Sequence, residues 1–418
     1  MSRYIIEGGN PLEGSIDVKA AKNSVLPLLA ACILTEDKVT LRNCPDISDI
    51  TNMLKIMINI GCVVERDDMG NITVDSSDIY CGEVPCVLAK ELRSSIFLMG
   101  PMLSRVKKAK ISYPGGCEIG MRPIDIHLSG LRELHIDINE EYGYLDCDAS
   151  KAEAAQIVLD LPSVGATENL MMASVFLEGK TVLRNCAKEP EIADLQNFLN
   201  LMGAKISGAG SSVIVIEGVK KLHGVEYTPI PDRIIAGTYI IAAAMCSGNV
   251  ELRGVVPEHI YSLIAKLSKT ACKIYCKNDK IIVKSKGRLR SLDRIDTMYY
   301  PGFPTDMQTQ MLALQTISKG TSVIVENIFE TRYKTVPEFK KMGADITVRD
   351  RTAIVRGVSR LKGAEVCATD LRGGASLVLA GLAAEGITEV KDIYHIDRGY
   401  EDMSRVLAEL GAKIERSS

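Results

Sequence analysis

The chain has 418 residues, which is enough for two or more domains with ample apolar cores. Its 50 basic and 53 acidic residues nearly balance, and with no Trp and few other aromatic residues it offers little support for a nucleic-acid surface. The N-terminus lacks the apolar core of a signal peptide, and the apolar stretches 25–34 and 234–246 are too short to span a bilayer. The 12 cysteines have neither the spacing of a disulfide framework nor that of a zinc site. We therefore expect a cytoplasmic protein with reduced thiols.

In chain order, the sequence repeats one unit six times, at intervals of roughly 70 residues. Each unit begins with a β-like segment that runs into a polar loop. These segments occupy 41–46, 111–116, 183–188, 252–257, 325–330 and 390–395. An amphipathic helix follows, and in four copies it closes on a glycine, at Gly61, Gly203, Gly343 and Gly411. Glycine there suits a left-handed helix end that leads into a strand. The second copy, around Leu134, and the fourth, Lys269-Thr-Ala-Cys, lack it.

A second helix precedes each β-like segment, and it is apolar almost all round. The six expected helices begin near 24, 95, 169, 234, 307 and 375. A helix without a polar face belongs inside a core. We therefore predict an α/β fold of two pseudo-symmetric domains, each with three units whose sheets and outer helices enclose the buried ones. The segment 227–232, rich in proline, is the natural hinge.

Polar or charged residues stand where these buried helices begin. They are Lys22 with Asn23, Arg93, Thr167 with Glu168, Asp232 with Arg233, Asp306 and Arg372. Cations at a helix N-terminus oppose the helix dipole, and we see no compensation for them in the sequence unless an anion binds there. The alternative is that each basic side chain is simply solvated. For Asp306, the two interpretations are an N-cap and a general base for a substrate hydroxyl.

The sequence of one loop, residues 114–122, favours the binding of an anion. In Pro114-Gly-Gly-Cys117-Glu-Ile-Gly-Met-Arg122, glycines allow close backbone approach, and N–H groups with a guanidinium would favour the Cys117 thiolate. Such a thiol serves as nucleophile or proton donor, although a tight turn with an exposed cysteine remains the alternative. Arg332 and Arg398 lie in comparable loops, so symmetry would gather six cations in one cleft for several phosphates or carboxylates. The small residues of 163–167 suit phosphate binding through backbone N–H groups, a weak signal alone.

These motifs, taken in order and spacing, resemble the UDP-N-acetylglucosamine 1-carboxyvinyltransferase family of enolpyruvyl transferases over essentially the whole chain. The resemblance rests on the following segments: 22–24, 92–95, 114–123, 162–167, 303–306, 370–372 and 397–400. It implies two inside-out α/β barrel domains, one of residues 22–229 and one of 1–21 plus 230–418, with hinges near 20–23 and 228–232. It also implies no metal and no organic cofactor, small-molecule substrates, and neither nucleic acid nor membrane as partner. We expect a monomer or weak oligomer.

The implied reaction transfers the enolpyruvyl group of phosphoenolpyruvate to the 3′-hydroxyl of UDP-N-acetylglucosamine and releases phosphate, the first committed step of peptidoglycan precursor synthesis. Cys117 would protonate the methylene carbon and form a covalent adduct at the adjacent carbon, and Asp306 would receive the hydroxyl proton. The other roles carried over fall to cations and polar residues. Lys22, Arg122 and Arg398 hold the phosphate, and Arg372 and Arg398 hold the carboxylate. Arg93 supports the phosphate site, and Asn23 steadies the tetrahedral intermediate. Ser163, Val164 and Gly165, with Arg122, hold the nucleotide. Pro123, Asp125, Ile328 and Arg332 complete the predicted substrate contacts.

Two positions depart from the family pattern. Ser48 and Leu161 stand where many relatives carry lysine, which puts one nucleotide contact in question. Two alternatives stay open. One is the related transferase that acts on shikimate 3-phosphate, against which Cys117 and 163–165 argue. The other is a non-catalytic paralogue that binds nucleotide sugars, which the presence of Cys117, Asp306 and Lys22 disfavours.

Overall fold

The computed structural model describes residues 2–79, 83–84, 86–113 and 124–417. They form two compact units: a terminal unit of residues 2–19 and 231–417, and a central unit of the described residues within 20–230. Three predicted site residues, Cys117, Arg122 and Pro123, lie outside the described residues. Across the described ranges, no helix is both long and apolar enough to cross a membrane.

Three sheets form in the described part of the central unit, in the orders β13-β3-β5-β4, β6-β8-β7 and β11-β12-β10-β9. Neighbouring strands are antiparallel, except that β13 runs parallel to β3 and β9 runs parallel to β10. The strands are β3 (Val39–Leu41), β4 (Val63–Arg66), β5 (Ile72–Asp75), β6 (Lys108–Ser112), β7 (Asp137–Glu141), β8 (Tyr144–Asp148), β9 (Gln156–Val158), β10 (Lys180–Arg184), β11 (Lys205–Ser207), β12 (Val213–Glu217) and β13 (Glu226–Tyr227).

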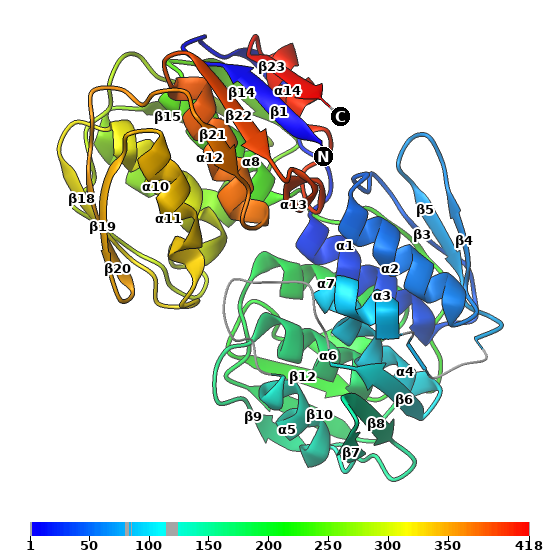
Figure 1. Ribbon diagram of the computed structural model, residues 1–418. Helices are drawn as coiled ribbons and strands as arrows, with labels where there is room; N and C mark the ends of the chain where they lie inside the picture. The colour runs from blue at the N-terminus through cyan, green and yellow to red at the C-terminus, as the bar shows by residue number, and fades with distance from the viewer. Residues whose placement is uncertain (1, 80–82, 85, 114–123, 418) are drawn as a thin grey trace. The chain divides into compact units, whose positions relative to one another are not determined.

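The terminal unit repeats this plan with four-stranded sheets ordered β15-β16-β14-β2, β17-β18-β20-β19 and β21-β22-β1-β23. β1 pairs with both β22 and β23, so the two ends of the chain share one sheet (Figure 1). The strands are β1 (Arg3–Glu7), β2 (Glu13–Asp17), β14 (Asn249–Arg253), β15 (Lys273–Lys277), β16 (Lys280–Lys284), β17 (Arg294–Asp296), β18 (Thr321–Val325), β19 (Asp345–Arg349), β20 (Thr352–Arg356), β21 (Glu365–Cys367), β22 (Ile387–Lys391) and β23 (Lys413–Ser417).

The helices without a polar face are buried, as their composition requires. In the terminal unit α8 (Arg233–Met245), α10 (Gln308–Ile317) and α12 (Leu371–Ala383) pack against one another, and nearly every residue in them is buried. In the central unit α1 (Lys22–Ala31) and α6 (Val164–Ser174) play this part. The helix expected near residue 95 is different, because it begins as a 3₁₀ turn, 93–98, and only then becomes α4 (Met99–Arg105).

The remaining helices each bury only part of their surface or are short. They are α2 (Ser48–Asn59), α3 (Cys86–Glu91), α5 (Asp125–Glu133), α7 (Pro190–Leu201), α9 (Tyr261–Leu267), α11 (Val336–Lys341), α13 (Tyr394–Asp397) and α14 (Met403–Glu409).

The left-handed turn expected after the amphipathic helices is confirmed. Gly61, Gly203, Gly343 and Gly411 have φ between 87° and 110°. The two copies without glycine keep the same backbone, since His135 has φ 59° and Ala271 has φ 77°. The turn is therefore required by the repeat itself, and at two positions a side chain adopts a conformation that ordinarily favours glycine.

Candidate functional site

The predicted cation at the start of α1 has an internal counter-charge. Lys22 is the first residue of the helix, after the N-cap Ala21, and its Nζ lies 2.5 Å from Asp49 Oδ2 on α2. Both side chains are almost wholly buried, at 10% and 3% exposed. The expectation that nothing in the chain compensates this cation is therefore wrong, because a carboxylate distant in sequence offsets the unfavourable helix dipole. Asn23, the next residue, is half-buried.

The start of α6 differs from the sequence prediction. Ser163 is the N-cap, and its Oγ accepts a hydrogen bond from the Ala166 N–H at 3.3 Å. Thr167, predicted to precede the helix, lies inside its first turns and donates from Oγ1 to the Ser163 carbonyl at 2.7 Å. Val164 and Gly165 are thus the first helical residues, whose N–H groups have no partner within a helix and suit an anion.

A buried histidine contacts this helix start. His127, on α5, is 7% exposed. The position of a Cβ at Gly165 would lie 3.1 Å from His127 Cε1, 3.2 Å from His127 Nε2 and 3.3 Å from Phe97 Cε1, so a side chain there would press on both rings. Burial and then the positive charge of Arg93 lower the pKa of His127 to about 4. Arg93 is half-buried at the start of the 3₁₀ turn, and Asp125 is exposed at the start of α5.

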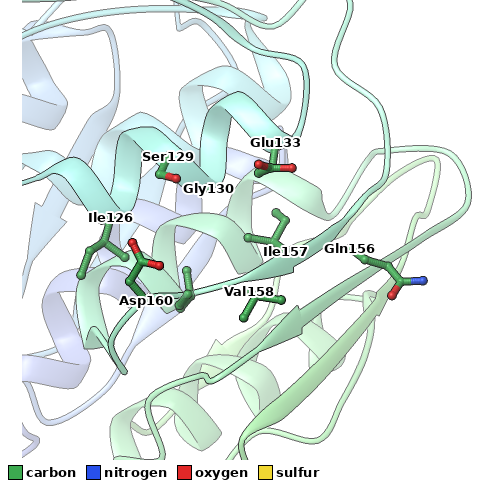
Figure 2. A pocket seen from close by; sticks show the side chains of 9 residues that line it. Ile126, Ser129, Gly130, Glu133, Gln156, Ile157, Val158 and Asp160 are labelled. Carbon is green, nitrogen blue, oxygen red and sulfur yellow. The ribbon is translucent and has the colours of Figure 1, made fainter.

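A cavity of about 200 Å³ lies between α5 and the segment that contains β9 (Figure 2). Ile126, Ser129, Gly130 and Glu133 line it from the helix, and residues 156–160 line it from the other side. Of the predicted site residues that the structure describes, none lines this cavity, although the cavity residues lie beside Asp125 and Leu161 in sequence.

In the terminal unit, Asp306 forms ion pairs rather than a helix cap. The N-caps of the 3₁₀ turn 305–307 and of α10 are Pro304 and Met307, so the capping interpretation is wrong. The Asp306 carboxylate accepts a short hydrogen bond from Arg332 Nη2, and its Oδ2 lies 3.5 Å from Arg372 Nη2. The Arg332 side chain is 1% exposed, whereas that of Asp306 is 26% exposed. Two guanidinium groups therefore stabilise the ionised form of Asp306.

Glu326, a residue without a predicted role, fixes the loop around this cluster. Its buried carboxylate accepts hydrogen bonds from Thr297 Oγ1 at 2.9 Å and Thr305 Oγ1 at 3.0 Å. It also accepts from the N–H groups of Ile328, at 2.9 Å, and Phe329, at 3.1 Å. One carboxylate thus sets the positions of the segment before Asp306 and of Ile328.

Both the backbone and the side chain of Arg372 have partners within the terminal unit. Asp370 caps α12 by accepting from the N–H groups of Arg372 and Gly373, which makes Arg372 the second helical residue. Arg372 Nη1 donates to the Tyr400 hydroxyl at 3.3 Å, and the Tyr400 ring lies 5.6 Å from the guanidinium carbon. The Tyr400 hydroxyl is 2.9 Å from Thr238 Oγ1. Although burial lowers the pKa of Arg372, Tyr400 and Asp306 raise it, so the guanidinium stays charged.

Arg398 closes α13 and is half-buried. The neighbouring Asp397 forms a two-point ion pair with Arg416, at 2.8 and 2.7 Å. Asp232, as predicted, begins a buried helix, and it caps α8 through the N–H groups of Ile234 and Ile235. In the described part of the chain, no cluster of three His, Cys, Asp or Glu side chains could hold a metal ion.

Solved structures identify the class of fold. The chain matches the enolpyruvyl transferase NikO from Streptomyces tendae with a TM-score of 0.89 and 25% identity, over 100% of this chain and 99% of NikO. It matches the EPSP synthase from Acinetobacter baumannii with a TM-score of 0.79 at 18% identity over the full length of both, which concerns the fold alone. The fold is the α/β fold of these transferases.

Sequence relatives narrow the class further. Residues 6–407 match the family described as EPSP synthase (3-phosphoshikimate 1-carboxyvinyltransferase). The chain is 51% identical to UDP-N-acetylglucosamine 1-carboxyvinyltransferase 2 of Caldanaerobacter subterraneus subsp. tengcongensis, over 100% of both chains. It is 46% identical to UDP-N-acetylglucosamine 1-carboxyvinyltransferase of Myxococcus xanthus, over 100% of this chain and 99% of the relative. The chain belongs to the EPSP synthase family, with the UDP-N-acetylglucosamine 1-carboxyvinyltransferases as its relatives, and the resemblance seen in the sequence is confirmed.

Proposed function

We propose that this protein transfers the enolpyruvyl group of phosphoenolpyruvate to the 3′-hydroxyl of UDP-N-acetylglucosamine and releases phosphate, a step of peptidoglycan precursor synthesis. The observation that carries the proposal is the 51% identity, over the whole of both chains, to a UDP-N-acetylglucosamine 1-carboxyvinyltransferase. The residues whose types suit the chemistry are present in both units, and we assign them roles as follows.

The central unit contributes cations and helix N–H groups. Lys22 and Arg122, with Arg398 of the terminal unit, hold the phosphate of phosphoenolpyruvate. Arg93 supports the phosphate site, and Asn23 steadies the tetrahedral intermediate. Ser163, Val164 and Gly165 bind the nucleotide, a role supported by the capped helix start, where N–H groups are available for phosphate oxygens. Arg122 also holds the nucleotide, and Asp125 and Pro123 are further substrate contacts. Cys117 protonates the methylene carbon, which leaves an oxocarbenium-like centre at the adjacent carbon.

The terminal unit contributes the base and the carboxylate site. Asp306 accepts the proton of the sugar hydroxyl as that oxygen attacks the cationic carbon. Departure of phosphate from that carbon, with loss of one proton from the newly formed methyl group, then restores the carbon–carbon double bond of the enolpyruvyl product. The ion pairs of Asp306 with Arg332 and Arg372 support its role as base, because a base must be ionised before it can accept a proton. Arg372 and Arg398 bind the carboxylate of phosphoenolpyruvate, and Ile328 is a further substrate contact. Neutralising these anions in a site poor in water is the larger part of the catalysis.

The proposal extends to the architecture. We regard the two units as the two functional domains, with bounds near 22–229 and 230–418 plus 1–21, and as inside-out α/β barrels. Support comes from the mutually packed helices α8, α10 and α12 and from the three sheets of each unit in the described part of the chain. A cytoplasmic location and a monomeric or weakly oligomeric state complete the proposal, and both follow from the sequence expectations.

The deciding assay measures phosphate release from phosphoenolpyruvate, in parallel with UDP-N-acetylglucosamine and with shikimate 3-phosphate. We expect release only with the nucleotide sugar. Release only with shikimate 3-phosphate would favour the second activity, which the family description permits. No release with either, together with measurable binding of the nucleotide sugar, would point to a non-catalytic paralogue.

The assignment of Cys117 is tested separately. Cys117→Ala should abolish turnover and leave binding of UDP-N-acetylglucosamine nearly intact. Cys276→Ala is the matched control, since Cys276 is an exposed free thiol on β15, outside the proposed site. The epoxide phosphonate fosfomycin should add one adduct in intact-mass analysis of the wild type and of Cys276→Ala, and none in Cys117→Ala. Full activity of Cys117→Ala would remove the thiol from the mechanism.

A further inference from the structure

The hydrogen bonds of Asn169 determine the protonation of His127. The Gly100 N–H can only donate, and it meets Asn169 Oδ1 at 2.8 Å. The Ile96 carbonyl can only accept, and it meets Asn169 Nδ2 at 3.0 Å. These two partners fix the orientation of the amide, so the group that faces His127 Nδ1, at 3.0 Å, is the NH₂ donor.

It follows that His127 Nδ1 accepts a hydrogen bond and carries no proton. The neutral ring then has its single proton on Nε2. A second proton, on Nδ1, would point at the NH₂ donor of Asn169, so two donors would face each other. The positive charge of Arg93 also disfavours a charged ring. His127 is therefore held as a neutral imidazole whose Nε2–H points away from Asn169.

The Nε2 atom of His127 lies beside the N-terminus of α6. Nε2 is 3.2 Å from the position that a Cβ would take on Gly165, the second residue of this 11-residue helix. The side chain is 7% exposed, and the residues that the structure describes provide no hydrogen-bond partner for Nε2. The Nε2 atom is not completely enclosed, so a ligand acceptor can reach it and would satisfy its N–H.

We propose that the Nε2–H of His127 donates a hydrogen bond to a phosphate oxygen of the nucleotide sugar bound at the start of α6. This inference rests on the proposed function, and it assigns a ligand contact to a residue that the sequence analysis did not select. The arrangement adds one side-chain donor to the N–H groups of Val164 and Gly165. Because the ring is neutral, it binds the anion without adding a third positive charge to those of the buried Lys22 and the half-buried Arg93.

Two substitutions separate this role from a structural one. Asn at position 127 places its Oδ1 where Nδ1 lies, so His127→Asn keeps the acceptor for Asn169 and loses the distant donor. Gln places its amide nitrogen near the position of Nε2, so His127→Gln keeps the donor and loses the acceptor. His223→Asn is the control, because His223 is an exposed histidine of the same unit whose Nδ1 lies 3.1 Å from the Gly224 carbonyl.

We expect His127→Asn to raise KM for UDP-N-acetylglucosamine about tenfold or more, the value of one hydrogen bond to a charged group. KM for phosphoenolpyruvate and kcat should stay near the wild type, and His127→Gln should recover most of the affinity. An unchanged KM in His127→Asn, or a larger loss in His127→Gln than in His127→Asn, would overturn the proposal and leave the proposed function standing.

Binding and spectroscopy decide the matter even without turnover. Titration calorimetry with UDP should show about tenfold weaker binding to His127→Asn than to the wild type or His223→Asn. Two-bond ¹H–¹⁵N correlations on the wild type should show the neutral Nε2–H ring at pH 7, with the Nε2–H signal shifted when UDP is added. Equal UDP affinity in all variants, or a ring protonated on Nδ1, would refute the assignment. Absence of wild-type turnover alongside the UDP effect would count against the proposed function only.

Discussion

Replacing Asp306 separates its chemical role from its structural one. Asp306 accepts from Arg332, whose side chain is 1% exposed, and lies 3.5 Å from Arg372. Asp306→Ala leaves Arg332 buried with one fewer partner, keeping its hydrogen bond to Thr305 at 3.2 Å and its contact with Phe329. Asp306→Asn keeps a side-chain oxygen for Arg332 and removes the charge and the basicity. The two variants should therefore differ in stability and agree in activity.

The magnitudes follow from burial. Removing one partner of a fully buried ion pair costs about 3–5 kcal/mol. Because the Asp306 side chain is 26% exposed, solvent screens the pair, and we expect Asp306→Ala to destabilise the terminal unit by about 2–3 kcal/mol. Asp306→Asn should cost about 1 kcal/mol, since the geometry survives. Loss of a general base should lower kcat by about 10²–10⁴-fold in both.

Urea unfolding followed by circular dichroism measures the first effect, and phosphate release measures the second. Glu330→Ala is a matched control, because Glu330 pairs with Arg351 at 3.3 Å on an exposed part of the same unit. An unfolding midpoint of Asp306→Ala equal to that of the wild type would show that the ion pair does not hold Arg332. A kcat of Asp306→Asn near the wild-type value would exclude Asp306 as the base.

Three further predictions concern residues around the site and in the repeat. Tyr400→Phe removes the hydroxyl that accepts a hydrogen bond from Arg372 Nη1. KM for phosphoenolpyruvate should therefore rise severalfold while KM for UDP-N-acetylglucosamine stays constant. Equal changes in both KM values would indicate general structural damage instead. Ala271→Gly relieves a left-handed alanine with φ 77°, and it should stabilise the terminal unit by about 1 kcal/mol in urea unfolding, with a lower midpoint as the contrary result. His127 has its pKa lowered from 6.5 to about 4, so below pH 6.5 the unfolded chain binds the proton more readily. Its contribution to stability is present above pH 6.5 and is lost as the pH falls towards 4, by about 2 kcal/mol at pH 5. Unfolding midpoints at pH 7.5 and pH 5 should therefore converge in His127→Asn relative to the wild type, and an unaltered pH dependence would contradict this.

The repeat could be predicted because its copies share features that are visible in the local sequence. A helix with apolar residues on every side has to be buried, and α8, α10 and α12 are. Glycine after an amphipathic helix predicts a left-handed turn, but the same turn at His135 and Ala271 is invisible in the sequence, because tertiary structure imposes it against local preference. The start of α6 was misplaced for a related reason. Val164, Gly165 and Ala166 are small, and only the capping bond to Ser163 reveals that the helix has already begun.

The residue types of the candidate site could be recognised in the sequence, whereas the residues that form ion pairs with them could not. Asp49 follows Ser48 on a different helix from Lys22, and no pattern of spacing links the two. Asp306, Arg332 and Arg372 belong to three separate segments, and they meet only because the terminal unit folds. One signal was available and unused: Asp370, two residues before Arg372 and directly before an apolar run, has the position and type of an N-cap.

The paired charges bear on how the proposed substrates bind. A lysine or arginine beside a helix N-terminus is repelled by the dipole, and without a partner it would turn towards solvent. Asp49 holds Lys22 in place, and Asp306 does the same for Arg372 and Arg332. These carboxylates weaken the net attraction for an incoming anion, because they neutralise part of the positive charge. In exchange, the cations are positioned before the substrate arrives, so binding requires little rearrangement of buried side chains. Under the proposed roles, each unit thus combines a lower electrostatic affinity with a preset geometry, a balance that favours catalysis over tight binding of phosphoenolpyruvate.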